Sequence, residues 1–129
     1  MTIYEFIQAH NIGMSVEPTD SNPNMADSEK MDHWKVCLHR GKSRMTLVFS
    51  MGSAHHGKEP ATADVLDCLA SDASGMNGGF EDWCSETGYD SDSRWAERTY
   101  NTIRNQTTRL ERFLGPVAFE TLLYHTERE

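Results

Sequence analysis

The sequence predicts an α+β fold in which a small antiparallel β-hairpin is covered by about five helices. Apolar and polar residues alternate over residues 34–40, and an apolar run at 45–51 follows a Gly41-Lys42 turn, which is the pattern of two paired strands. From residue 61 onward, apolar residues recur every three or four positions, as they do on amphipathic helices. Two strands alone are marginally stable, so helices must cover their apolar face.

A short helix and a loop are predicted before the hairpin. The helix spans residues 3–11, because Phe6 and Ile7 share one helical face and Gly13 is a favourable stop. Residues 15–31 are polar and contain two prolines, so we expect a mobile loop there.

Two shorter helices are predicted after the hairpin. Residues 61–73 carry apolar side chains at helical spacing. Phe80 and Trp83 share one face of a second helix, which Gly88 closes.

A long helix is predicted in the C-terminal half. We expect Asp90 or Ser91 to cap it, and we expect Gly115-Pro116 to end it and to start the last helix. The apolar side of the long helix is a heptad-like stripe that we interpret as core. A dimer seam is the alternative, so the chain is predicted to be a monomer or a dimer. The stripe consists of Ala96, Tyr100, Ile103, Thr107, Leu110 and Leu114.

Length and composition favour one soluble domain over residues 1–129. No apolar run reaches the length of a membrane span, and the first residues lack the basic and apolar regions of a signal peptide. We therefore expect no membrane association. Three scattered cysteines indicate reduced thiols in a cytosol.

The charges are unevenly distributed along the chain. A formal net charge of -8 makes direct nucleic-acid binding unfavourable. Nine acidic residues and no Lys or Arg lie between Glu59 and Asp92, whereas the segment from Lys35 to Arg44 has four bases and no acid. The arginines of the long helix do not form one clean stripe in the sequence. This distribution predicts one acidic surface and one or two basic ones.

The segment from Gly52 to Lys58 reads G-x-x-x-x-G-K and is one residue short of a phosphate-binding loop. Glu59 occupies the position of the required hydroxyl and would repel phosphate. Pro60 makes the next helix begin too late to donate its first amides to a ligand. A single hairpin also lacks the parallel strands of such nucleotide-binding domains. We interpret the segment as a strand-to-helix loop.

Metal and catalytic sites receive weak support. His55, His56, Cys37 and His39 have side chains that bind zinc, but their spacing matches no standard zinc signature. No pattern selects a nucleophile together with a base and an oxyanion stabiliser. We therefore predict no enzyme and no cofactor. A small zinc-binding protein or enzyme centred on His55 and His56 is the alternative.

Three motifs resemble a family of short accessory proteins of tailed bacteriophages and prophages. They are FEDWC, GYDSDSR and SMGSAHHGKEPATADVLDCL, and the similarity extends from about Met31 to Gly115. The resemblance implies no catalytic activity. It implies a small protein made in the cytosol of an infected bacterium.

Together these observations predict a phage-encoded, non-enzymatic inhibitor of a host defence protein, such as a CRISPR effector, and hence an anti-CRISPR-like protein. Acidic side chains would imitate nucleic-acid phosphates and occupy a basic groove on the target. The predicted partner-binding residues are Asp64, Asp67, Asp72, Glu81, Asp82 and Glu86. The alternative is a nucleic-acid-associated phage regulator that uses the bases of the hairpin. Those bases are Lys35, Arg40, Lys42 and Arg44.

Overall fold

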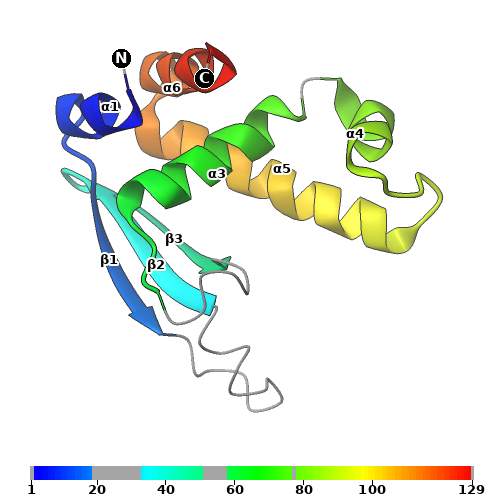
Figure 1. The fold of residues 1–129 in the computed structure, drawn as a ribbon, viewed down its shortest axis with the longest axis horizontal. Coiled ribbons are helices and arrows are strands. Elements are labelled where there is room, and N and C mark those ends of the chain that lie inside the picture. Colours follow the sequence, from blue (N-terminus) through cyan, green and yellow to red (C-terminus); the bar gives the residue numbers. More distant parts are fainter. Residues whose placement is uncertain (1, 19–32, 51–57, 77, 129) are drawn as a thin grey trace. The chain divides into compact units, whose positions relative to one another are not determined.

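Figure 1 shows the computed structural model of the chain, which describes residues 2–18, 33–50, 58–76 and 78–128. Within these residues there are five helices and one sheet of three antiparallel strands, as predicted for an α+β fold. In chain order they are α1 (Ile3–Ala9), β1 (Gly13–Pro18), β2 (His33–Arg40), β3 (Ser43–Ser50), α3 (Thr62–Ser74), α4 (Gly79–Thr87), α5 (Arg94–Leu114) and α6 (Pro116–Arg128). They belong to two compact units, Tyr4–Val65 and Met1–Ile3 with Leu66–Glu129.

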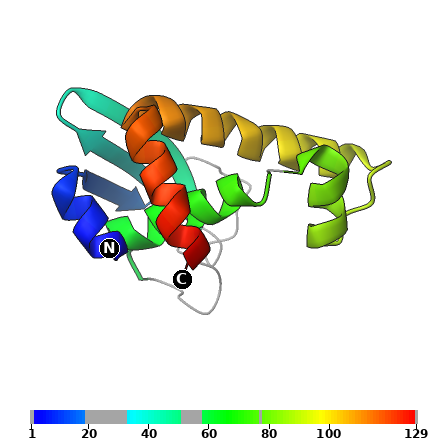
Figure 2. The ribbon, with the colours of Figure 1, turned by 90° about the horizontal axis from the view of Figure 1, so that it is seen from above.

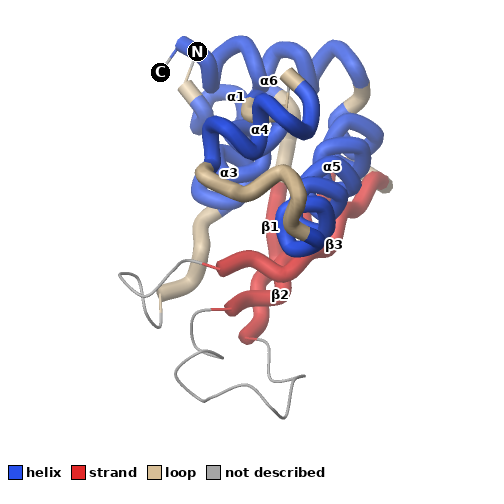
Figure 3. The backbone as a smooth tube through the Cα atoms, turned by 90° about the vertical axis from the view of Figure 1, so that its right-hand side faces the viewer, coloured by secondary structure: helices blue, strands red, loops and turns tan. Residues whose placement is uncertain are grey.

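The predicted hairpin is present as β2 and β3, and β1 adds a third strand on the other side of β2. Val36 of β2 lies opposite Val16 of β1 and Leu47 of β3. Val36 and its alternate neighbour Leu38 are fully buried, whereas Lys35 is exposed. The sheet, drawn in red in Figure 3, therefore has one apolar buried face and one polar outer face.

The predicted loop over residues 15–31 is wrong at its start, because residues 15–18 belong to β1. Ser15 and Glu17 are exposed, so only Met14 and Val16 give this short strand an apolar side. Pairing with β2 along its full length stabilises β1 through backbone hydrogen bonds, which composition does not reveal. Residues 19–31 lie outside the described part of the chain.

Helix α1 ends two residues earlier than predicted, at Ala9. The chain turns at Asn11, whose φ of 52° lies in the left-handed region. Gly13 is therefore not the stop of the helix but the first residue of β1. There the imidazole ring of His39 fills the space that a Cβ atom on Gly13 would need.

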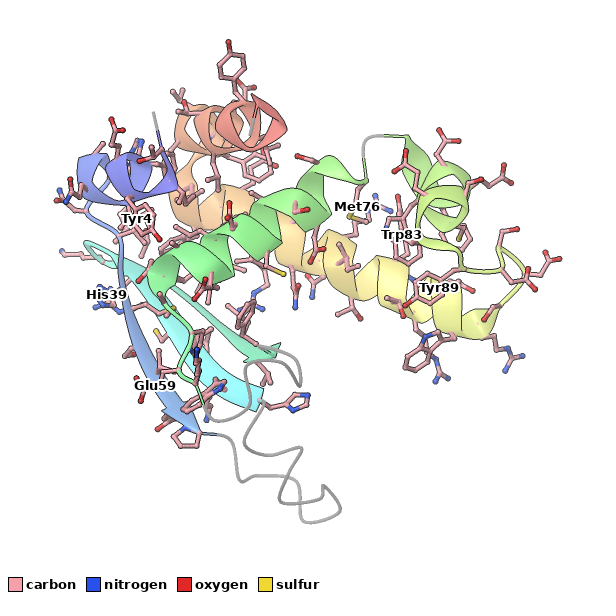
Figure 4. All side chains as sticks on the ribbon, viewed as in Figure 1. Tyr4, His39, Glu59, Met76, Trp83 and Tyr89 are labelled. Atoms are coloured by element: carbon pink, nitrogen blue, oxygen red, sulfur yellow. The ribbon has the colours of Figure 1, made fainter. Side chains whose placement is uncertain are left out.

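An aromatic cluster joins α4 to α5 in the second unit. The Trp83 ring stacks on Tyr89, with centroids 5.1 Å apart, and meets the Tyr100 ring edge-on at 5.5 Å. Phe80 meets Tyr100 at 5.1 Å. Figure 4 labels Trp83 and Tyr89, together with Met76, which packs against the same group. The aromatic cluster comprises Met76, Phe80, Trp83, Cys84, Tyr89, Ala96, Tyr100 and Ile103.

The predicted long helix is α5, and its heptad-like stripe is core. Ala96, Leu110 and Leu114 are buried, and Tyr100 and Ile103 pack in the aromatic cluster. Among the described helices, α5 included, none is long and apolar enough to cross a membrane.

The cap of α5 differs from the prediction. Ser93 Oγ accepts hydrogen bonds from the backbone N–H groups of Trp95 at 3.1 Å and Ala96 at 3.4 Å. The predicted caps were Asp90 and Ser91. Asp90 instead accepts the N–H of the residue two positions later, at 3.0 Å, and so shapes the turn before the helix.

Gly115 and Pro116 separate α5 from α6 as predicted, and Figure 2 shows the sharp bend between the two helices. Gly115 has a φ of 85° and a ψ of 157°, a conformation that only glycine adopts readily. Its N–H donates to the carbonyl of Glu111 at 2.8 Å, and its carbonyl accepts the N–H of Phe119 at 2.9 Å. A single residue thus ends one helix and lets the next begin.

Replacing Gly115 by Ala should destabilise the protein by about 1–3 kcal/mol, because a side chain disfavours this conformation. Apart from Gly115 itself and its two chain neighbours, no residue has an atom within 4 Å of the added Cβ, so the cost is conformational and not steric. Urea unfolding measures the effect. The matched control is Gly75→Ala, where the new Cβ meets only ordinary contacts at 3.6 Å. Equal stability of the two variants would contradict the assignment.

Candidate partner-binding surface

Helix α3 presents acidic side chains on its exposed side. Asp64 and Asp67 are exposed, whereas Leu66 and Leu69 are buried on the opposite side. Asp64 has a structural role, because its Oδ2 accepts the N–H of Ala61 at 2.9 Å at the start of the helix. Asp64 also belongs to the first compact unit, whereas the five other predicted partner-binding residues belong to the second.

Two acids flank the thiol of Cys68 on α3. Partial burial, and then the negative charges of Asp72 and Asp67, raise the pKa of this thiol. Burial also raises the pKa of Asp72 itself. Asp72 lies in the last turn of α3, where the carbonyl ends of the helix already make the potential negative. The carboxylate of Asp72 is therefore disfavoured by its local surroundings.

Helix α4 adds three more carboxylates. Glu81, Asp82 and Glu86 are exposed, whereas Trp83 and Cys84 of the same helix are buried. The Asp82 side chain packs over Gly78, where it fills the space that a Cβ atom would need. Helix α4 therefore buries its aromatic side and exposes its acidic side.

The acids of α4 differ in how they affect the helix. Glu81 and Asp82 lie in the first turn, where a negative charge stabilises the free N–H groups. Glu86 lies in the last turn, where a negative charge is unfavourable by about 0.3–1 kcal/mol and no basic residue compensates it. Helix stability thus explains Glu81 and Asp82 but leaves Glu86 unexplained.

We call these carboxylates of the second unit the acidic surface. Within the described residues none of them forms an ion pair, in contrast to Glu17, which pairs with Lys35. Unpaired carboxylates are available to a cationic partner at no cost in broken contacts. The acidic surface consists of Asp67, Asp72, Glu81, Asp82 and Glu86.

The four bases of the hairpin do not form a comparable patch. Lys35 pairs with Glu17 at 3.8 Å on the outer face of the sheet. Arg44 lies opposite His39, four positions along β2 from Lys35, and its guanidinium donates to the carbonyl of Gly41 at 2.8 Å. Lys42 is exposed in the turn, and Arg40 is partly buried at the end of β2. These contacts engage Lys35 and Arg44, and Arg40 is not free either.

The geometry also gives little support to the alternative of a zinc site. Cys37 and His39 share the outer face of β2, and Cys37 lines a hollow of about 210 Å³ with Ser15, Glu17 and Lys35. Within the part of the chain that the structure describes, no three His, Cys, Asp or Glu side chains are grouped to hold a metal. The other two candidates, His55 and His56, lie outside the described residues, as does most of the Gly52–Lys58 segment.

Sequence reasoning missed the exposed side of α5. Six polar residues from Arg94 to Arg112 follow the same spacing as the apolar stripe, each two positions before a stripe residue. Their side chains can donate hydrogen bonds. The prediction that the arginines do not form one clean stripe is correct, because Arg104 and Arg109 lie outside this row, and the row becomes visible only when the two asparagines and Thr108 are included. Projection onto a helical wheel would have revealed it.

Replacing Asp72 by Asn should stabilise the protein at neutral pH. Burial raises the pKa of Asp72 in the folded state, so ionisation costs stability above that pKa. The cost disappears as the pH falls below the unfolded value of about 3.9, where the carboxyl is protonated in both states. Thermal melts should therefore show a higher Tm for the variant near neutral pH and a smaller difference toward pH ~4.

The exposed Asp67→Asn is the matched control for this titration, and it should change Tm less. A lower Tm for Asp72→Asn at neutral pH would contradict the assignment of Asp72 as a locally unfavourable carboxylate.

Comparison with family models, with curated proteins and with solved structures gives no match to this chain.

Proposed function

We propose that this chain is a phage-encoded inhibitor without catalytic activity that binds a host defence protein of the CRISPR effector type. The observation that carries the proposal is the acidic surface, whose five carboxylates have no ion-pair partner among the described residues. These carboxylates would occupy a basic groove that otherwise holds nucleic acid.

Rigid presentation of the charges supports imitation of nucleic acid. Helix α4 is nine residues long, too short to be stable by itself, and the aromatic cluster anchors it through Trp83. Carboxylates on an anchored helix keep their spacing, so binding does not have to order them. Fixed negative charges are what a groove shaped for phosphates attracts.

Among the carboxylates, Asp72 and Glu86 support a binding role most strongly. Both lie in the last turn of a helix, where negative charge lowers stability. Side chains that oppose the local physics of a fold are expected at functional sites. Asp64, Glu81 and Asp82 give weaker support, since capping and the helix dipole already account for them.

The proposed bacteriophage origin of the protein rests on its sequence motifs. The FEDWC and GYDSDSR motifs resemble phage accessory proteins, and both lie in or next to α4. An inhibitor of this kind would act in the cytosol of the infected bacterium. The hairpin-based regulator receives less support, because Lys35 and Arg44 already have partners.

The double variant Asp72→Lys/Glu86→Lys separates binding from stability. Lysine in the exposed last turn of α4 is favourable, whereas a lysine charge at the partly buried position 72 carries a desolvation cost, so the variant should unfold at about the same temperature as the unaltered protein. It should also lose inhibition, because two carboxylates of the acidic surface become positive. Inhibition is measured as loss of target-DNA binding by purified, guide-loaded CRISPR effector complexes in a gel shift assay.

The control is Glu120→Lys, which changes an exposed acid on α6 outside the acidic surface and should preserve inhibition. Inhibition of at least one effector by the unaltered protein, lost only in the double variant, supports the proposal. Full inhibition by the double variant, or inhibition of no effector, contradicts it.

A further inference from the structure

Helix α5 carries a second charged surface, of opposite sign, on its exposed side. Six exposed residues follow one another at intervals of four and three positions, and none of them is acidic. The spacing is that of the buried heptad-like stripe shifted by two positions, so the row runs along the opposite side of the helix. We call it the donor row: Arg94, Arg98, Asn101, Asn105, Thr108 and Arg112.

Most donors of the row are unused. Within the described residues, Arg94, Arg98 and Arg112 form no ion pair. Asn101 and Asn105 likewise have no side-chain partner there, whereas the Thr108 hydroxyl donates to a backbone carbonyl one turn earlier. The row therefore offers three guanidinium groups and two amides to an external acceptor.

The acids of α5 lie beside the row and not in it. Glu97 and Glu111 are seven positions to either side of Arg104, so all three share one flank of the helix. Arg104 is thus an exposed arginine in an acidic neighbourhood, whereas Arg94 and Arg98 belong to the donor row.

An exposed indole lies on the other flank, near the N-terminal end of the row. Trp95 is 66% exposed, whereas the two other tryptophans, Trp34 and Trp83, are buried. Trp95 is three positions from Arg98, which places the two side chains on neighbouring parts of the helix surface. A large aromatic side chain left in water beside cations is a stacking surface for a planar ligand.

We propose that the donor row binds the phosphodiester backbone of single-stranded nucleic acid, with Trp95 stacking on an unpaired base. Arginine and asparagine donate hydrogen bonds to phosphate oxygens. The row is about 27 Å long, with a donor about every 5 Å, so it contacts several successive phosphates. The bases of a duplex are stacked on one another, and only a single strand offers a free base face to Trp95.

This site is distinct from the acidic surface and predicts a second activity. The net charge of -8 opposes polyanions, so binding should be weak and should require low salt. The rival occupant with matching charge is the acidic surface of a second copy. A long regular row with an adjacent aromatic ring favours a nucleic-acid strand over that surface.

The test measures binding of a fluorescein-labelled oligothymidine of about 15 nucleotides by anisotropy, at roughly 50 and 200 mM salt. Three arginine contacts predict a slope of log K against log salt of about -2. The intrinsic tryptophan emission should fall on binding, and Trp95→Phe should abolish that change, because the buried tryptophans do not report on the ligand.

Arg94→Ala/Arg98→Ala should weaken binding at least about tenfold and reduce the slope to about -0.7. Arg104→Ala is the matched control on the same helix and should change affinity less than about twofold. Thermal melts confirm that each variant is folded. The lysine variants of Asp72 and Glu86 should retain oligonucleotide binding, so this test fails or succeeds independently of the proposed inhibitor function.

Several results would overturn the inference. One is absence of binding at the lower salt concentration, and another is an equal loss of affinity in Arg104→Ala. Equal affinity for a duplex of the same length would refute the single-strand assignment. Sedimentation velocity without oligonucleotide tests the rival: self-association that disappears in Arg94→Ala/Arg98→Ala, with no oligonucleotide binding, would assign the row to a second copy.

Discussion

The stacking of Trp83 within the aromatic cluster is the contact on which the placement of α4 depends. Helix α4 is too short to persist alone, and Trp83 and Cys84 are its buried side chains. Trp83 contacts both Tyr89 and Tyr100, and its contact with Tyr100 holds the helix against α5. Because one side of α4 is fixed in this way, its other side presents Glu81, Asp82 and Glu86 in a constant arrangement.

Opposite charges lie on different helices of the same unit. The acidic surface covers the exposed sides of α3 and α4, and the donor row covers the exposed side of α5. Because the charges are segregated, neither surface contains internal ion pairs. Such pairs between exposed residues would add little to the stability of the protein. Free charges of one sign steer a complementary partner toward the surface and make its binding salt-dependent. Two partners of different chemistry are thus proposed for the two surfaces.

Local signals made most of the fold predictable from the sequence. The alternation in β2 and the Gly115-Pro116 pair each act within a few residues, so the hairpin and the end of α5 were predicted correctly. Strand β1 was missed because pairing with β2 stabilises it, and this partner is distant in sequence. The cap of α5 was misplaced because the four neighbouring polar residues at 90–93 compete for it, and backbone geometry selects Ser93.

The candidate site was predictable in composition but not in detail. The run of acids from Glu59 to Asp92 indicated an acidic surface. The sequence did not show which of these acids stabilise a helix, because that depends on where each helix begins and ends. Asp64 accepts a hydrogen bond at the start of α3, whereas Glu86 lies in the last turn of α4. Hydrogen exchange across α4 measures whether the aromatic cluster holds this helix in place. Trp83→Ala should remove amide protection from residues 79–87 while α6 stays protected, because the aromatic cluster is what holds α4 in place. Unchanged protection of α4 in that variant would contradict the account.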